Sequence, residues 1–140
     1  LKAKELCDIS LLQGECNLFM NAFNDLNSPS KTQKVGWGTL DKGILAKSVT
    51  LDRKFEKSDA RSWAPWWKKG NWKEKVKLLE KYSKEFCMQN AFHYSLSHVD
   101  KSLIGIKSEE HLVQVENILS LLNEVEINSN EVADEFRAKL

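Results

Sequence analysis

Three short apolar segments set the strongest limit on how this chain can fold. They cover residues 9–13, 34–40 and 102–106, and glycines crowd around the second of them. Runs of this length between turn-like residues predict buried strands, and the glycines predict a close backbone approach or a sharp bend. Helical stretches alternate with these strands, which indicates parallel βα units. The sequence therefore predicts an α/β fold with a parallel sheet.

Several amphipathic helices are predicted around the strands. In residues 72–88 the apolar side chains recur at steps of three and four, and five lysines interleaved with glutamates are expected on the solvated faces. Asn71 is expected to cap this helix, and residues 90–97 form a further predicted helix. Ser108 is expected to cap a helix whose apolar residues share one face, and Ser129 is a second cap candidate, for a short helix to Leu140.

Other segments give weaker signals. Residues 1–7 have a helical composition, residues 17–27 carry apolar side chains at helical spacing, and residues 27–30 are a break. Residues 46–71 are predicted to be an irregular loop, which is long enough to suggest a function. This loop holds a cluster of tryptophans, which either form the wall of a ligand pocket or anchor the loop, and a pair that could form a salt bridge. These residues are Trp63, Trp66 and Trp67, with Asp59 and Arg61 as the pair.

Length and charge exclude several classes of protein. A chain of 140 residues predicts one domain, and it is too short for a closed (β/α)8 barrel of about 250 residues. The formal net charge of +1 argues against an electrostatic nucleic-acid binder. No apolar run approaches the roughly 18 residues of a membrane span, so no membrane partner is expected.

The cysteines and histidines do not suggest a metal site. Cys7, Cys16 and Cys87 are odd in number and have no metal-ligand spacing, and the three histidines form no zinc motif. Free and mostly buried thiols are typical of a reducing compartment, so a cytoplasmic location is expected.

Candidate binding residues lie where the predicted strands end. Gln13 offers an amide and Trp37 a flat ring, while Lys107 and Ser108 stand where a helix begins and could receive a phosphate. Parallel βα folds bind ligands at this edge. A nicotinamide dinucleotide has the matching parts. The residues alone also fit a buried glutamine, a core tryptophan and an ordinary helix cap, so both interpretations stay open.

Three motifs in this order resemble the C-terminal part of the aldo/keto reductases. Residues 11–18 (LLQGECNL) resemble the sixth strand of the family, typically L-Q-V-E-Y-N-L, and residues 35–45 (VGWGTLDKGIL) resemble the seventh strand, A-W-S-P-L-A-x-G-L-L. Residues 95–98 and 102–112 resemble L-S-H-P followed by V-I-x-G-x-R-S-x-E-Q-L. The resemblance covers residues 1–122 and implies a partial (β/α)8 TIM barrel of about strands six to eight, incomplete as given. Residues 123–140 are then a C-terminal tail with a short helix.

The resemblance implies NADP(H) as cofactor. By analogy, Gln13 would bind the nicotinamide carboxamide, Trp37 would stack on the ring, and Lys107 and Ser108 would hold the 2′-phosphate side. The full set of implied cofactor-binding residues is Gln13, Trp37, Gly38, Thr39, Leu40, Lys107, Ser108 and Gln114.

The chain departs from the family pattern at several positions. Gly38 and Thr39 replace a Ser-Pro pair, so a hydroxyl for the pyrophosphate would have to come from Thr39, one residue later. Gln114 and Val115 replace a Glu-Asn pair near the adenine, and Val115 has no polar side chain for that role. Lys47 lies one residue from where some members place a lysine.

The family's catalytic Asp, Tyr, Lys and His all lie in the first half of its barrel, outside the resemblance, and carbonyl reduction needs a positioned proton donor. Tyr82 and Tyr94, the tyrosines of this chain, are expected to be packing residues. We therefore expect no catalytic residue here and a cofactor-binding role, in a complete barrel that reduces a small carbonyl substrate. Three strands leave sheet edges open, which the missing half or self-association would cover.

Two alternatives belong to other classes. A non-catalytic, aldo/keto reductase-like binding or regulatory module would account for the altered turn at Gly38 and Thr39 and for Val115. A helical interaction domain would leave the strand motifs as coincidence.

Overall fold

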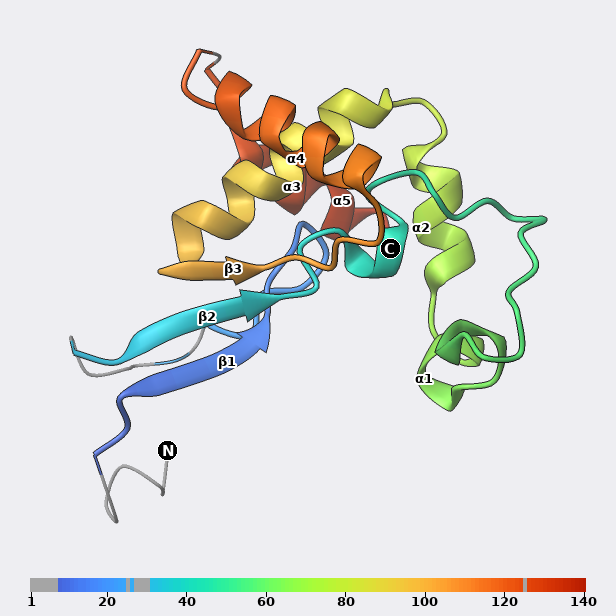
Figure 1. Cartoon of the computed structure of the whole chain (residues 1–140), viewed down its shortest axis with the longest axis horizontal. Coiled ribbons are helices and arrows are strands. Elements are labelled where there is room, and N and C mark those ends of the chain that lie inside the picture. Colours follow the sequence, from blue (N-terminus) through green and yellow to red (C-terminus); the bar gives the residue numbers. More distant parts are fainter. Residues whose placement is uncertain (1–7, 25, 27–30, 125) are drawn as a thin grey trace.

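A three-stranded parallel sheet forms the centre of the computed structural model, which describes residues 8–24, 26, 31–124 and 126–140 (Figure 1). Its strands are β1 (Leu11–Glu15), β2 (Gln33–Trp37) and β3 (Lys101–Leu103), in the spatial order β1-β2-β3. The α/β fold and the parallel sheet predicted from the sequence are thus confirmed, and a purely helical domain is excluded. Residues 1–7 and 27–30, for which a helix and a break were predicted, lie outside the described residues.

Each strand lies close to its predicted position but has different ends. The first begins two residues later than expected, the second ends at Trp37 rather than Leu40, and the third covers only three residues. The chain turns after Trp37 because Gly38 adopts φ +73°, a left-handed conformation that favours glycine. Gly36 allows close packing inside the strand, since a Cβ there would lie 3.1 Å from Val99. The glycines thus provide the close approach and the bend that the sequence predicted.

The helices are α1 (Pro65–Lys68), α2 (Trp72–Leu79), α3 (Lys84–His98), α4 (Glu109–Leu121) and α5 (Ser129–Ala138), with short 3-10 turns η2 (Asp41–Gly43) and η3 (Ala60–Ser62). The prediction of one helix over residues 72–88 is wrong. A new helix starts after Ser83, whose Oγ accepts a hydrogen bond from the amide of Phe86 at 3.0 Å. The resulting α3 also includes the separate helix predicted for residues 90–97.

The helix caps agree with the sequence in one case and differ in others. Ser108 caps α4, and its Oγ accepts from the amide of His111 at 3.3 Å. Asn71 precedes α2 but makes no side-chain cap bond. Asn128 rather than Ser129 caps α5. Ser129 is instead buried and lies 2.7 Å from Nδ1 of His93 on α3. Ser129 is therefore the first residue of α5 rather than its cap, and its side chain links α5 to α3.

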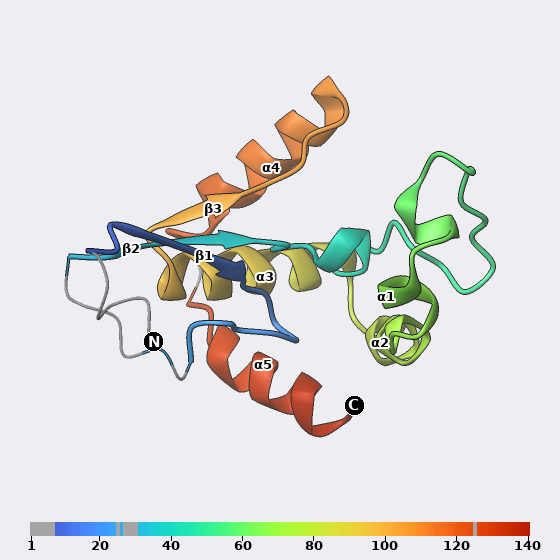
Figure 2. The same ribbon diagram turned by 90° about the horizontal axis from the view of Figure 1, so that it is seen from below.

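Helices α3 and α5 cover one face of the sheet, and the opposite face stays open over β1 and β2, with α4 rising on that side beyond β3 (Figure 2). α3 and α5 lie below the sheet in that view, while α4 packs against α3 through Met88, Phe92, Val115 and Ile118. The open face carries Leu11, Trp37 and Leu103, which are 43%, 42% and 53% exposed. A parallel sheet is normally covered on both faces. This chain by itself therefore presents an unusual apolar surface.

The C-terminal helix α5 packs against the connection between β1 and β2, where the sequence suggested a helix. The described residues of the β1–β2 connection form turns and an isolated bridge rather than the helix that the spacing of Leu18, Phe19, Phe23 and Leu26 suggests. α5 packs against this connection, where Phe136 stacks on Phe19 with ring centroids 5.7 Å apart. Arg137 Nη2 also donates to the carbonyl oxygen of Asn17 at 3.4 Å. The tail is therefore part of the core.

We predict that Phe136→Ala lowers the free energy of unfolding by about 3–5 kcal/mol, because it removes a fully buried ring and leaves a cavity between α5 and the β1–β2 connection. Chemical denaturation would measure the loss. Leu140→Ala is the matched control, since Leu140 is 43% exposed just after the same helix. Equal stabilities of the two variants would show that α5 does not hold the fold together.

Candidate functional site

The carboxyl ends of the three strands point toward a lobe that contains η3, α1 and α2 (Figures 1 and 2). Gln13 pairs with Val35 and Glu15 with Trp37 in the parallel register, so the side chains of Gln13 and Trp37 lie on the same, open face. Both residues are exposed. The structure therefore places the predicted amide and the predicted aromatic ring on the same exposed face, two register positions apart on neighbouring strands.

The turn after β2 places the next predicted residues differently. Thr39 is 2% exposed, and its hydroxyl lies 2.6 Å from Ser102 Oγ and 3.4 Å from Ser95 Oγ. Leu40 is partly buried and packs against the main core, which includes Cys16 and Leu45, and against the α3–α4 contact around Met88. The hydroxyl of Thr39 therefore faces the covered side of the sheet, and only the backbone of the Gly38–Leu40 turn remains for a ligand on the open side.

The predicted phosphate-binding residues lie after β3. Lys107 is exposed, and Ser108 is exposed while capping α4. Gln114 is half-buried on α4, whereas Val115 is buried in the contact with α3. The structure therefore leaves Lys107 free to meet an anion, but it uses Val115 for packing.

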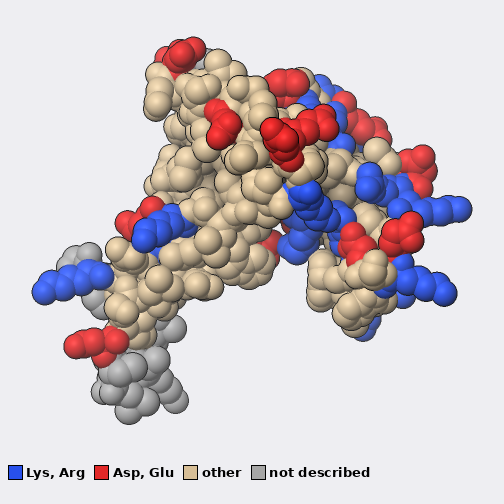
Figure 3. All heavy atoms as spheres, in the orientation of Figure 1, with Lys and Arg blue, Asp and Glu red and all other residues tan. Residues whose placement is uncertain are grey.

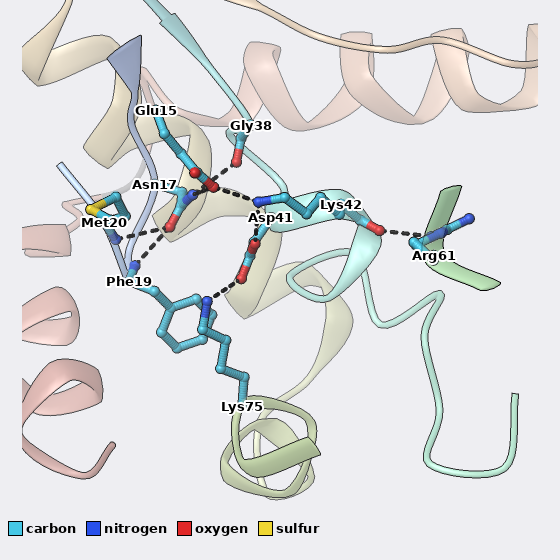
Figure 4. A network of polar contacts seen from close by, with 9 residues as sticks. All are labelled: Glu15, Asn17, Phe19, Met20, Gly38, Asp41, Lys42, Arg61 and Lys75. Carbon is cyan, nitrogen blue, oxygen red and sulfur yellow. Dashed lines mark hydrogen bonds and ion pairs between the residues drawn. The ribbon is translucent and has the colours of Figure 1, made fainter. Parts of the chain in front are cut away.

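A polar network that the sequence did not reveal connects the ends of β1 and β2 with the lobe (Figure 4). The Nζ atom of Lys42 lies 2.7 Å from Oε1 of Glu15 and 3.3 Å from Oδ1 of Asp41. The second carboxylate oxygen of Asp41 lies 2.7 Å from Nζ of Lys75 on α2. Burial alone would lower the pKa of Lys42, but the hydrogen bond that Lys42 donates to Glu15 and the charges of the Glu15 and Asp41 carboxylates hold this pKa above its ordinary value. Lys42 therefore stays charged.

The backbone under this network is strained. Asp41 and Lys42 have φ angles of 42° and 57°, a left-handed conformation that is uncommon for residues with a side chain. Asp41 is also buried, so its charge needs partners, which the two lysines supply. Strained residues of this kind concentrate at functional sites, where the surrounding structure holds them in place.

The side chain of Asn17 links the end of β1 to the turn after β2. Its side chain is fully buried, its Oδ1 accepts from the amides of Phe19 and Met20, and its Nδ2 donates to the carbonyl oxygen of Gly38 at 3.0 Å. Nδ2 also lies 3.3 Å from Oε1 of Glu15. The amide is therefore fully used in holding β1 and the turn after β2 together.

The tryptophans of the loop have different roles. Trp67 is 4% exposed and stacks on Trp72 at 5.1 Å between ring centroids, so it anchors the lobe. Trp63 and Trp66 are 58% and 53% exposed. The Nζ atom of Lys42 lies 5.8 Å from the ring centroid of Trp66 and 6.0 Å from that of Trp37. The predicted pair Asp59 and Arg61 forms, with Nη2 of Arg61 2.6 Å from the carboxylate.

Other candidate residues have structural roles. Lys47 donates from Nζ to the carbonyl oxygens of Leu79 and Tyr82, at the end of α2, where a positive charge stabilises a helix. Tyr94 is buried, and its hydroxyl accepts from Arg137 of α5 at 2.7 Å. Cys16 and Cys87 are buried free thiols, and burial raises the pKa of Cys87 to about 11.

Sequence reasoning could have found part of the network. An Asp-Lys-Gly turn directly after a strand was visible at residues 41–43, but its link to Lys75 depends on tertiary packing. The lysines of residues 72–88 were predicted to be solvated, and for Lys75 this is wrong, because its side chain is 17% exposed and bound to Asp41.

The described residues contain no helix long and apolar enough to cross a membrane. Within the same ranges, no group of His, Cys, Asp and Glu side chains could hold a metal ion. In the space-filling view, uncharged surface spreads over the sheet, and a notch separates the sheet from the α1 lobe (Figure 3). The arrangement therefore offers apolar faces, an amide and paired charges around an open strand edge.

The fold of this chain, a parallel α/β sheet with helices on one face, is similar to that of a known protein. The structure resembles that of the glycerol dehydrogenase from Gluconobacter oxydans, an aldo/keto reductase, with a TM-score of 0.55 and 20% sequence identity. The match covers 89% of this chain and 46% of that enzyme, so the chain spans less than half the length of the protein it resembles. No protein-family model and no curated protein matches the chain. The likeness is one of fold, and it agrees with the resemblance of the three motifs.

We predict that Asp59→Asn makes folding less sensitive to acid. The hydrogen bonds from Arg61 hold the pKa of Asp59 well below its ordinary value, and the charge of Lys107 adds to this. A carboxyl group with a lowered folded-state pKa stabilises the fold above its unfolded-state pKa of about 3.9 and loses this contribution as the pH falls below it.

Urea denaturation at a series of acidic pH values would show the effect as a smaller loss of stability for Asp59→Asn than for the wild type. Asp134→Asn is the control, because the side chain of Asp134 is 82% exposed. The same acid sensitivity in Asp59→Asn and the wild type would contradict the prediction.

Proposed function

We propose that this chain is the cofactor-binding C-terminal portion of an NADP(H)-dependent oxidoreductase of the aldo/keto reductase type. The observation that carries the proposal is the placement of Gln13 and Trp37 on the same open face, on neighbouring strands and two register positions apart, near the carboxyl ends of β1 and β2. The order of the three parallel strands and the fold likeness to an aldo/keto reductase support it.

Each proposed residue has a distinct binding role. Trp37 offers a face for stacking of the nicotinamide ring, and Gln13 offers a donor and an acceptor for its carboxamide. The backbone of the Gly38–Leu40 turn, which directly follows Trp37, would contact the cofactor next to the nicotinamide. Lys107 and Ser108 supply a cation and a hydroxyl for the phosphate on the adenosine side, with Gln114 near the adenine. The bound cofactor supplies the hydride, and this chain orients it.

In the complete protein, β1, β2 and β3 would be strands six to eight of a (β/α)8 barrel. The remaining strands would pair with the outer edges of β1 and β3 and cover Leu11, Trp37 and Leu103. They would also bring the proton donor that reduction of a carbonyl substrate requires. A second copy of this chain is the other partner that could cover these edges.

A second candidate function is a non-catalytic module with the same fold. Two observations favour it, since the hydroxyl of Thr39 is bound to Ser102 inside the protein and Val115 is buried against α3. Both positions would then serve packing rather than the cofactor. Binding of NADPH by the chain separates the two functions.

We predict that NADPH quenches the tryptophan fluorescence of this chain in a saturable way and that Trp37→Ala removes part of that signal. Loss of the stacking face should weaken NADPH binding by about three- to tenfold. Trp63→Ala is the control, because this exposed tryptophan lies in the loop before α1. Absence of binding up to millimolar NADPH would contradict the proposal and favour the non-catalytic module.

We also predict that Lys107→Met reduces the preference for NADPH over NADH. The cofactors differ by a phosphate, which Lys107 would bind through a charge-assisted hydrogen bond. Parallel fluorescence titrations with NADPH and NADH would measure the ratio of the two dissociation constants. Lys101→Met is the control, because Lys101 is also exposed but lies at the amino end of β3. An unchanged ratio of the two dissociation constants in Lys107→Met would show that Lys107 does not bind the additional phosphate of NADPH.

A further inference from the structure

A cavity of about 270 Å³ lies between residues 44–52, which follow η2, and helix α2. The segment runs past α2 on its way to the lobe (Figure 1). None of the residues proposed to bind NADP(H) lines this cavity, so the proposed function leaves it without a role. We propose that the cavity binds a small primary amine with an apolar body, in its protonated, alkylammonium form.

The buried part of the cavity wall is apolar. Ile44, Val49 and Leu79 are buried members of the main core, and the half-buried Val76 of α2 packs against them. Leu51 extends the apolar wall toward the surface. This part of the wall is therefore held in place from behind, and it can take an apolar ligand body out of water. Each CH₂ group buried there strengthens binding by up to about fourfold.

The exposed part of the cavity wall carries two carboxylates, those of Asp52 and Glu80. Among the residues that the structure describes, neither carboxylate forms an ion pair. The hydroxyl of Thr50, which also lines the cavity, helps to hold the pKa of Asp52 below its ordinary value. Asp52 is therefore charged at neutral pH and has no cation to balance it.

Lys47, the one cation in the cavity wall, is engaged elsewhere. Its Nζ atom donates to the carbonyl oxygens of Leu79 and Tyr82, at 3.1 and 2.6 Å. The ammonium group thus answers the negative end of the α2 dipole rather than the carboxylates. Two carboxylates and one ammonium group leave the wall with one net negative charge, which favours a cationic ligand.

The position of these groups determines which kind of cation fits. A ligand with its apolar body against the buried wall would present its head group to Asp52 and Glu80 at the surface. An ammonium group has three N–H donors, and charge-assisted hydrogen bonds to carboxylates are stronger than neutral ones. Sites for drug-sized ligands measure roughly 300–1,000 Å³, so a cavity of about 270 Å³ suits a smaller molecule.

The test compares three six-carbon compounds that differ in the charge of the head group, namely hexylammonium, hexanol and hexanoate. Ligand-observed NMR titration of the chain would measure the three affinities. We expect hexylammonium to bind most tightly and hexanoate least. Within the series from ethylammonium to hexylammonium, the affinity should rise with each added CH₂ group until the apolar wall is covered.

Variants of the two carboxylates test the head-group contact. Asp52→Asn and Glu80→Gln should each weaken hexylammonium binding by about two- to fivefold, the range expected for an ion pair near the surface, and should leave hexanol binding nearly unchanged. Glu74→Gln is the matched control, because Glu74 is an exposed carboxylate of the same helix that does not line the cavity. It should change neither affinity.

A filling variant tests the apolar wall. Val76→Phe places a larger side chain in the cavity and should weaken binding of both hexylammonium and hexanol. Circular dichroism would verify that this variant and the carboxylate variants fold like the wild type.

The inference would be overturned by equal affinities of the wild type for hexylammonium and hexanol, or by unchanged hexylammonium binding when Asp52→Asn and Glu80→Gln are combined. Tighter binding of hexanoate would also overturn it and would assign the cavity to an anion bound by Lys47. Binding of NADPH does not enter these measurements, so their outcome is independent of the proposed function.

Discussion

The structure depends on a parallel sheet that is covered on one face only. Parallel strands are ordinarily buried on both sides, because their crossover helices cover both faces or, in a closed barrel, because the strands enclose a core of their own. Here α3 and α5 supply one layer, and the opposite face keeps Leu11, Trp37 and Leu103 exposed. The open face makes Trp37 accessible to a ligand, and it also makes an apolar surface that further strands would cover in a complete barrel.

The covered face is completed from the far end of the chain. Phe136 and Arg137 of α5 reach Phe19 and Asn17 in the β1–β2 connection, which has no helix among its described residues. Asn17 in turn binds Gly38 directly after Trp37. The C-terminal helix and the strand ends therefore belong to one packed unit, and a change in α5 can reach the candidate site through Asn17.

The sequence predicts the parts of this structure that depend on local pattern. The apolar runs located the strands, and Ser108 located the start of α4, because both signals lie within a few neighbouring residues. The split between α2 and α3 was missed, since the apolar spacing continues through the break and only the Ser83 cap marks it. The packing of α5 and the contact between Lys75 and Asp41 both involve residues far apart in the sequence. The periodicity of apolar residues does not predict such long-range contacts.

The same distinction explains the candidate site. Gln13 and Trp37 could be chosen from the sequence because strand ends are where parallel folds bind ligands. The surroundings of Trp37 could not be predicted from the sequence. Lys42 lies near the rings of Trp37 and Trp66 because of the left-handed turn at Asp41 and Lys42 and because Arg61 holds the lobe to this turn. A buried aspartate in such a turn requires its cations to stay in place, because loss of either would leave part of its charge unpaired. The ion pairs that stabilise the turn therefore also hold the lobe against the ends of β1 and β2.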